Sequence, residues 1–168
     1  MNSAPQVVIG MGVSGSGKTT LAPLLAAAWP ASFIDADDIH DDAARARMAA
    51  GLPLTDAMRD PWVARIADDF VQRVANGERV VLAFSGLRRR HRERLRATGL
   101  SLRFLFLHGD QALIAARMQA RSGHYMPASL LDSQFEALEM PAGEADVVPL
   151  AIDRMPAEML RDALAACT

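Results

Sequence analysis

The chain has 168 residues, of which 51% are apolar, and its 18 basic and 20 acidic side chains give a net charge of -2. This length predicts one domain with a substantial core, and the apolar content excludes a disordered chain. The near balance of charge gives no electrostatic indication of a nucleic-acid or anionic-membrane partner.

Cysteine content and the distribution of apolar residues indicate a cellular compartment. The single cysteine, Cys167, cannot form an internal disulfide, which favours a reducing environment. The N-terminal residues show no signal-like apolar run, and no stretch approaches the roughly 18 apolar residues of a membrane span. We therefore expect a cytoplasmic protein with no membrane partner.

Short apolar runs alternate along the chain with longer segments of helical character. Strands are expected at 6–11, 32–35, 80–84, 102–107 and within 146–152. Helices are expected at 19–29, 39–50, 61–75, 88–98, 110–121, 129–139 and 156–166. Asp38 and Asp60 stand where helix N-caps are expected. Continuously apolar strands that alternate with helices predict a single α/β domain over 1–168, with a parallel sheet covered on both faces.

The first expected strand leads into Gly12–Thr19, which fits the phosphate-loop pattern G-x-x-x-x-G-K-[ST] at every position. Its glycines let backbone N–H groups point inward around phosphate oxygens, at the N-terminus of the next helix. Lys18, the only lysine in the chain, is expected to reach the β- and γ-phosphates, and the Thr19 hydroxyl to bind Mg²⁺. The alternative, a chance glycine-rich turn, is disfavoured by the strand and helix that flank the motif. The expected nucleotide-binding residues are Gly12, Val13, Ser14, Gly15, Ser16, Gly17, Lys18, Thr19 and Thr20.

The second expected strand ends in acidic residues. Open α/β sheets bind ligands outside the carboxyl ends of their strands, so Asp35 and Asp37 should both project toward the site if the extended backbone persists through Asp37. One carboxylate, for which we take Asp35, would hold Mg²⁺ with Thr19. The other would orient or deprotonate a hydroxyl acceptor. Capping of the next helix is the alternative role, and we assign it to Asp38.

His40, Ala44 and Arg47 follow at helical spacing, so we expect them on one face of the helix at 39–50. For His40, a substrate contact and a surface position both remain open. The sequence has no HxxH motif or Cys/His cluster, so a structural zinc site is not expected.

The third expected strand ends at Ser85, again on the ligand edge, and an arginine-rich helix follows from Arg88. One interpretation of this basic run is a nucleic-acid-binding patch, but the run contains no aromatic residue for stacking. We favour a solvated helix face with one or two arginines turned inward to meet an anion.

Arg117 and Arg121 lie one helical turn apart, just before Ser122-Gly123-His124. Arginines that border a glycine-containing loop are suited to closing over a transferred phosphate. Simple surface exposure is the alternative.

Together these motifs resemble the gluconokinases of the small phosphate-loop (P-loop) kinase type, which are related in fold to shikimate and nucleoside monophosphate kinases. The Gly-His-aromatic and Ser-Gln-Phe blocks are the most particular to that family. Beyond the phosphate loop, the resemblance rests on Asp35-Ala36-Asp37 with His40, Arg47-Met48, Gly51-Leu52-Pro53-Leu54, Arg59 with Pro61-Trp62, Ser85, Gly123-His124-Tyr125, Leu130-Leu131, Ser133-Gln134-Phe135, Leu138-Glu139 and Pro141.

The resemblance implies a three-layer α/β P-loop kinase fold, with a five-stranded parallel sheet and a mobile lid at about 117–128. It implies transfer of the γ-phosphoryl group of ATP to the 6-hydroxyl of D-gluconate, with Mg²⁺, by a homodimer. The implied substrate contacts are Asp37, His40, Arg47, Arg59, Ser85, Arg88 and His124. The implied catalytic residues are Lys18, Asp37, Arg117 and Arg121, of which the two arginines also bind nucleotide. The resemblance leaves the role of Gln134 open.

The chain departs from the family pattern at Asp41, Ala44 and Met58, all on the acceptor side. An amide at position 44 would hydrogen-bond an acceptor hydroxyl, so alanine predicts a weaker hold there. Arg47 is expected to compensate at the acceptor carboxylate.

Three other functions fit parts of the sequence. A kinase for another small hydroxy acid, such as shikimate, is the nearest. A nucleotide-binding regulatory module that transfers no phosphate is the second, and the intact Lys18, Thr19 and Asp37 argue against it. A nucleic-acid binder is the third.

Overall fold

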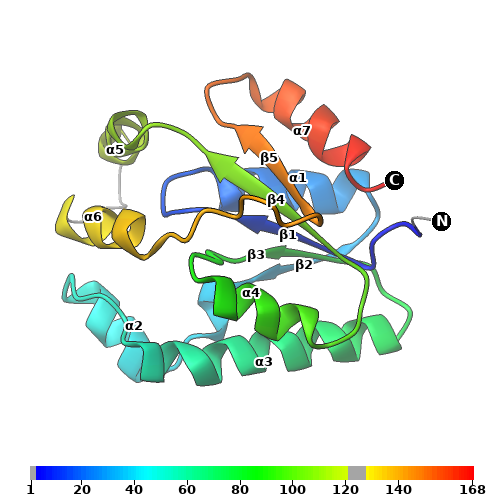
Figure 1. Ribbon diagram of the computed structural model, residues 1–168, viewed down its shortest axis with the longest axis horizontal. Helices are drawn as coiled ribbons and strands as arrows, with labels where there is room; N and C mark the ends of the chain where they lie inside the picture. The colour runs from blue at the N-terminus through cyan, green and yellow to red at the C-terminus, as the bar shows by residue number, and fades with distance from the viewer. Residues whose placement is uncertain (1–2, 121–127) are drawn as a thin grey trace.

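The computed structural model describes residues 3–120 and 128–168. Its centre is a five-stranded parallel sheet with strand order β2-β3-β1-β4-β5 (Figure 1), which confirms the predicted sheet. The strands are β1 (Val7–Met11), β2 (Ser32–Asp35), β3 (Val80–Ala83), β4 (Leu102–His108) and β5 (Val147–Ala151). Because all five strands run the same way, their carboxyl ends meet at one edge of the sheet.

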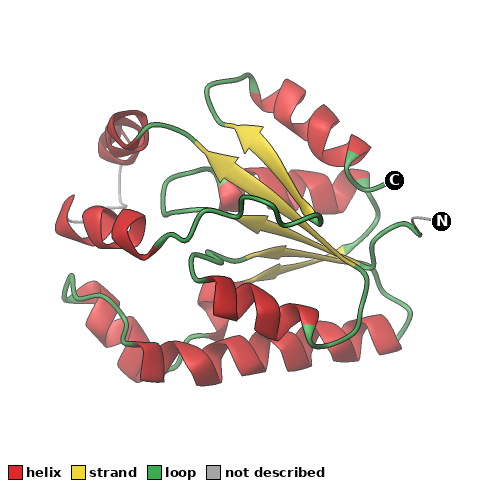
Figure 2. Ribbon diagram, viewed as in Figure 1, coloured by secondary structure: helices red, strands yellow, loops and turns green. Residues whose placement is uncertain are grey.

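Helices cover both faces of the sheet (Figure 2), which gives the expected three layers. They are α1 (Lys18–Ala28), α2 (Asp42–Ala49), α3 (Asp56–Ala75), α4 (Arg89–Arg96), α5 (Gln111–Ala120), α6 (Ala128–Ala137) and α7 (Pro156–Ala165), with a 3₁₀ turn, η1 (Ala36–Ile39). In the part of the chain described here, every helix is too short or too polar to cross a membrane.

The burial of the central strand β1 on both faces explains why its sequence is continuously apolar. Val8 packs in a core cluster with α1 and α7, on one face of the sheet. Val7, Ile9 and Met11 pack on the other face with α3 and α4. Each of these four side chains is fully buried. A strand buried on both faces needs no polar alternation.

Two helices begin more than one residue away from the expected position. The segment after β2 first forms η1, and α2 is capped by Asp41, whose Oδ1 accepts the Ala44 N–H at 2.8 Å. Asp38 is therefore not the cap. Helix α3 begins at Asp56, where the preceding Thr55 accepts the Met58 N–H. Pro61 thus lies inside α3 rather than at its start, at the cost of one backbone hydrogen bond in the second turn.

The largest fully buried side chain is a charged one, Arg92 on α4. Its guanidinium bonds both carboxylate oxygens of Glu144, at 3.0 and 2.7 Å. It also donates to the carbonyl oxygens of Gly86 (2.6 Å) and Glu139 (3.1 Å). Arg92 therefore joins the loop that follows β3 to the segment that follows α6. The expected inward arginine is present, but the anion that it meets is a side chain of the protein itself.

We expect Arg92→Met to lower the free energy of unfolding by up to about 3–5 kcal/mol, because it removes the bidentate partner of Glu144 and, among the described residues, leaves that buried carboxylate only its contact with Arg96 at 2.8 Å. The matched control is Arg94→Met, since Arg94 is exposed on the same helix, and its effect should stay within about 0.5 kcal/mol. Urea denaturation of both variants measures the difference. Equal effects of the two substitutions would contradict the structural role assigned to Arg92.

Candidate functional site

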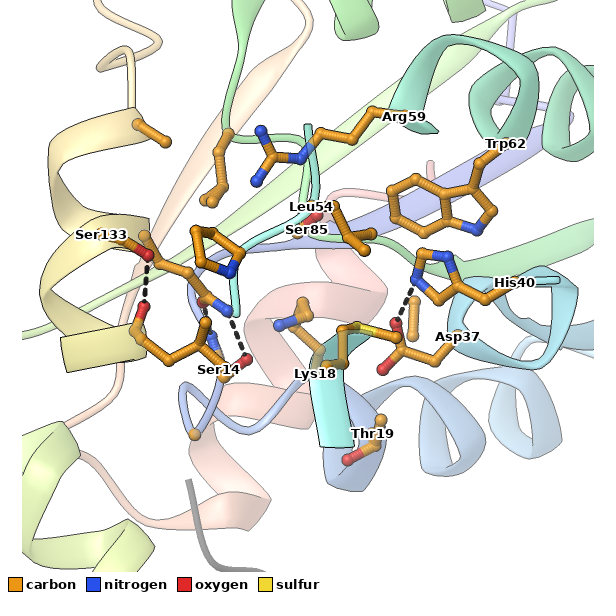
Figure 3. A pocket seen from close by; sticks show the side chains of 18 of the residues that line it. Ser14, Lys18, Thr19, Asp37, His40, Leu54, Arg59, Trp62, Ser85 and Ser133 are labelled. Atoms are coloured by element: carbon orange, nitrogen blue, oxygen red, sulfur yellow. Dashed lines mark hydrogen bonds and ion pairs between the residues drawn. The ribbon is translucent and has the colours of Figure 1, made fainter. Parts of the chain in front are cut away.

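A cavity of about 860 Å³ lies at the carboxyl ends of β1, β2 and β3. This volume is typical of a site for a small molecule. The phosphate loop supplies one side of it, and Figure 3 shows Lys18 and Thr19 across the cavity from Arg59. Met48, Leu52, Pro53 and Leu54 give the cavity an apolar wall.

The phosphate loop is closed in on both sides by neighbouring elements. Gly12 has a φ of 150°, and a Cβ there would lie 2.6 Å from the carbonyl oxygen of Leu107 on β4. Gly15 has a φ of 78°, and a Cβ there would lie 2.5 Å from Cγ of Met118 on α5. Only glycine satisfies both the backbone conformation and the space at these positions. Sequence reasoning predicted the conformation but not the close approach of Met118.

Lys18 folds back onto its own loop. Its Nζ donates to the carbonyl oxygens of Gly12 (2.9 Å) and Val13 (3.0 Å). Burial lowers the pKa of Lys18 to about 8, while the negative charges of Asp37 and Asp35 act in the opposite direction. The loop therefore holds a cation beside two carboxylates at the mouth of the cavity.

Asp35 and Asp37 both line the cavity, although the assumption behind that prediction is wrong. The extended backbone ends at Asp35, and the chain turns into η1 at the next residue. Asp35 Oδ1 accepts the Asp37 N–H at 3.0 Å and so caps this turn. Burial raises the pKa of Asp35. The tight turn, rather than a shared strand face, brings the two carboxylates to the same cavity.

His40 holds Asp37 from the side (Figure 3). Its Nε2 lies 3.5 Å from Asp37 Oδ1, and this contact lowers the pKa of Asp37. The buried imidazole stacks on Trp62 with ring centroids 4.1 Å apart. Trp62 in turn donates its Nε1–H to the carbonyl oxygen of Ala36, at 2.8 Å. A chain of packed groups from α3 to η1 thus holds His40 against Asp37 and favours the ionised carboxylate.

Basic and hydroxyl side chains form the opposite wall. Arg59 comes from α3, and Ser85 and Arg88 come from the loop between β3 and α4. All three line the cavity. The cavity therefore has a cationic wall suited to a carboxylate and, across it, carboxylates suited to a hydroxyl or a metal ion.

The prediction that His40, Ala44 and Arg47 share one helix face on the acceptor side is wrong. His40 ends η1 and precedes α2. Ala44 is buried at 4% exposure. Arg47 donates its Nε–H to the carbonyl oxygen of Pro53 at 2.6 Å. Because neither Ala44 nor Arg47 lines the cavity, an amide at position 44 would not meet the acceptor.

A second cavity, of about 360 Å³, lies on the other side of the phosphate loop and shares Gly15, Gly17 and Ala120 with the first. Thr20 and Arg117 line this second cavity. The Arg117 guanidinium donates to the carbonyl oxygen of Ile152, after β5, at 2.7 Å.

Some expected site residues lie outside the described part of the chain. These are Arg121 and His124, together with most of the expected lid at 117–128. Their roles stay predictions.

Comparison with known proteins places this arrangement in a family. A family model described as an AAA domain matches residues 7–141. The chain is 44% identical over 144 residues to the thermosensitive gluconokinase of Escherichia coli (strain K12), covering 85% of this chain and 77% of that protein. It is 39% identical over 162 residues to the gluconokinase of Gluconobacter oxydans (strain 621H), covering 96% and 91%. The chain belongs to the gluconokinase family.

A solved gluconokinase structure supports the same assignment. The structure of a gluconokinase from Sinorhizobium meliloti 1021 matches with a TM-score of 0.89 and 40% identity, covering 99% of this chain and 93% of that chain. The resemblance predicted from sequence motifs is thereby confirmed. The fold of this gluconokinase-family chain also agrees with the predicted P-loop kinase fold.

Among the residues that sequence reasoning missed at this gluconokinase-family site is a histidine of the cavity wall, His91. Its arginine-rich helix was expected to be solvated, yet His91 is buried at 5% exposure and lines the larger cavity. Its Nε2 lies 3.4 Å from Asp60 Oδ1. The available signal was the spacing of Arg88, His91, Arg92 and Leu95, which places them on one helix face.

Two further cavity residues, Ser133 and Gln134, come from α6. They belong to the Ser-Gln-Phe block, so their presence was noted but their function was not. No local pattern shows which distant residue a polar side chain on a helix will contact.

Proposed function

We propose that this protein transfers the γ-phosphoryl group of ATP to the 6-hydroxyl of D-gluconate, giving 6-phosphogluconate and ADP. The observation that carries the proposal is the single cavity in which Lys18 and Asp37 face Arg59 and Arg88. The gluconokinases to which the chain is similar support the choice of acceptor.

We assign the phosphates of ATP to the backbone nest of Gly12–Thr19, at the N-terminus of α1. Lys18 would leave the carbonyl oxygens of its own loop and bind the β- and γ-phosphates instead. The second cavity, beside Thr20 and Arg117, continues from the loop and would take the nucleoside. Arg121, which sequence places one helical turn after Arg117, is proposed to bind nucleotide with it.

Mg²⁺ fits the residues at the mouth of the cavity. This cation is typically held by one or two carboxylates, water and substrate phosphates rather than by a cage of protein ligands. Thr19 and Asp35 both line the cavity, and within residues 3–120 and 128–168 no group of three or more ligating side chains forms such a cage. Burial raises the pKa of Asp35, so a cation there would stabilise its ionised form. When bound, Mg²⁺ would neutralise charge on the phosphate oxygens.

Gluconate has a carboxylate at one end and the reacting hydroxyl at the other, so a cavity with two different walls orients it. We assign the carboxylate to Arg59 and Arg88, and the chain of hydroxyls to the space beside His40 and Ser85. The 6-hydroxyl then lies at Asp37, next to the phosphate loop. His124 is proposed to join these contacts.

In the transfer step, the 6-hydroxyl oxygen forms a bond to the γ-phosphorus. The bond from that phosphorus to the oxygen it shares with the β-phosphate breaks, and ADP leaves with that oxygen. The hydroxyl proton passes to Asp37 and then to solvent. The contact with His40 lowers the pKa of Asp37 and so favours the ionised carboxylate, which has an oxygen that can accept the proton as the new bond forms. Lys18 would stabilise the charge on the transferred group.

Three broader proposals rest on the family resemblance. These are a single domain over 1–168 with a lid at about 117–128, a homodimer, and a cytoplasmic location. The single sheet with a packed core on each face supports the first. Light scattering during gel filtration would test the second.

We expect gluconate to give the highest kcat/KM in an ADP-release assay across sugar acids, shikimate and nucleoside monophosphates. The reason is that Arg59 and Asp37 meet opposite ends of an open-chain acid. Detection of phosphorus coupled to C6 in the product by NMR identifies the acceptor oxygen. Faster ADP release with shikimate, or release that does not depend on any acceptor, would contradict the proposed function.

We expect Asp37→Asn to lower kcat by about 10²–10⁴-fold, because an amide cannot accept the hydroxyl proton. Affinity for ATP should change by less than about threefold, since Asp37 acts on the acceptor. The matched control is Asp38→Asn, which changes an exposed neighbour that does not line the cavity. Steady-state kinetics and calorimetry measure the two quantities. A loss of ATP affinity with unchanged kcat at saturation would show that the role is assigned wrongly.

A further inference from the structure

Gln134 on α6 forms hydrogen bonds with one residue of the phosphate loop, Ser14, which lies 120 residues earlier in the sequence. Its Oε1 accepts the Ser14 N–H at 2.7 Å, and its Nε2 donates to Ser14 Oγ at 2.9 Å. Figure 3 shows these bonds at Ser14. Both residues line the larger cavity, beside Lys18. The side-chain amide thus uses both of its ends on one loop residue.

The direction of this amide follows from its partner. A backbone N–H can only donate, so the atom that faces Ser14 N must be the carbonyl oxygen of Gln134. The NH₂ group then faces Ser14 Oγ, and the Ser14 hydroxyl must accept. The two hydrogen bonds therefore fix which way the glutamine amide points.

This arrangement leaves one donor on Ser14 unused. A serine hydroxyl can donate one hydrogen bond while it accepts another. Among the described residues, Ser14 Oγ accepts from Gln134 and donates to no protein acceptor. Its hydrogen is therefore available on the cavity side of the phosphate loop. The Ser14 N–H, by contrast, is taken by Gln134 and is not available to a phosphate oxygen.

Neighbouring packing limits movement at the same corner of the loop. Met118 on α5 lies against Gly15, where a Cβ would meet its Cγ at 2.5 Å. On α6, Leu130, Leu131 and Ala137 are buried. The loop is thus held at Ser14 by a polar contact from α6 and bordered at Gly15 by an apolar side chain from α5. Small displacements of a group that contacts a reacting phosphate have large effects on rate.

We propose that Ser14 is a further catalytic residue, whose hydroxyl donates to the γ-phosphoryl group, and that Gln134 is the positioning residue that orients this hydroxyl. The proposal rests on the proposed function, since it assigns the γ-phosphate to the cavity side of Gly12–Thr19. Gln134 acts through Ser14 and does not itself need to touch the nucleotide.

A double-mutant cycle tests the pair. It compares the parent, Ser14→Ala, Gln134→Leu and the double variant, with Gln111→Leu as the matched control. Gln111 bonds Asp132 on α6 and does not touch the phosphate loop, so its loss perturbs the same helix without touching Ser14. Thermal unfolding of all five proteins reports any general loss of stability.

The first readout is the preference for a β,γ-imido analogue of ATP over ADP, measured by calorimetry without acceptor. Each single variant should lower this preference by about tenfold, because a donor to a charged γ-phosphate is lost. Affinity for ADP should be unchanged. The double variant should lose no more than the larger single variant, because both changes remove the same contact. Gln111→Leu should behave as the parent.

The second readout is kcat for gluconate, which should fall in the same non-additive way, with the KM for gluconate unchanged. Additive losses, or equal weakening of the analogue and ADP, would overturn the proposal. The proposal would also be overturned if Gln134→Leu lowered thermal stability but kept the parent's kcat and the parent's preference for the analogue over ADP. If Gln134→Leu fails to fold, an undiminished analogue preference in Ser14→Ala overturns the proposal by itself.

A failure of the proposed function gives a result that differs from a failure of the Ser14–Gln134 proposal. A parent without gluconate-dependent ADP formation contradicts the choice of acceptor. In that case the calorimetric preference for the triphosphate analogue still decides the role of Ser14 and Gln134.

Discussion

The parallel pairing of β1 between β3 and β4 is the constraint on which the site depends. Val7 lies opposite Val80 on one side and Leu102 on the other, so β1 is the middle strand of five. The phosphate loop consequently leaves from the middle of the carboxyl edge. It divides that edge into a larger cavity toward β3 and β2 and a smaller one toward β5. Two ligands can therefore meet where the cavities adjoin, beside Gly15 and Gly17 of the loop.

The charges of the larger cavity are held in place before any ligand arrives. The carbonyl oxygens of its own loop hold Lys18, and His40 keeps Asp37 ionised from a position stacked on Trp62. Arg92 fixes the carbonyl oxygen of Gly86, just ahead of Arg88. Phosphoryl transfer depends mainly on position and electrostatics. In this protein buried contacts from several helices supply both.

Local features of the sequence predicted much of this arrangement. The strands were predictable because a strand buried on both faces is continuously apolar, and the phosphate loop because its function needs a fixed spacing of glycines and Lys18. The helix starts were less predictable, since Asp38, Asp41, Thr55 and Asp60 are all chemically able to cap a helix. Only the three-dimensional path of the chain selects among such caps.

Tertiary contacts account for the rest of what sequence reasoning missed. Arg92 and Arg94 are two residues apart on one arginine-rich helix, yet one is fully buried and the other is exposed. The bonds between Gln134 and Ser14 join segments 120 residues apart, and neither segment contains a sign of the other. Arg47 lies near the site in sequence, but it bonds the carbonyl oxygen of Pro53 and does not itself line the cavity. A motif can thus name the residues of a site without giving their partners.

The central claim is that one cavity binds gluconate in a single direction, with its carboxylate at Arg59 and its 6-hydroxyl at Asp37. A crystal structure of the protein with gluconate, Mg²⁺ and the β,γ-imido analogue of ATP tests this claim most directly. The account predicts the 6-hydroxyl oxygen within about 3.2 Å of the Asp37 carboxylate, with the gluconate carboxylate on the Arg59 guanidinium. A gluconate bound in the reverse direction, or outside the cavity that Lys18 and Asp37 share, would contradict the account.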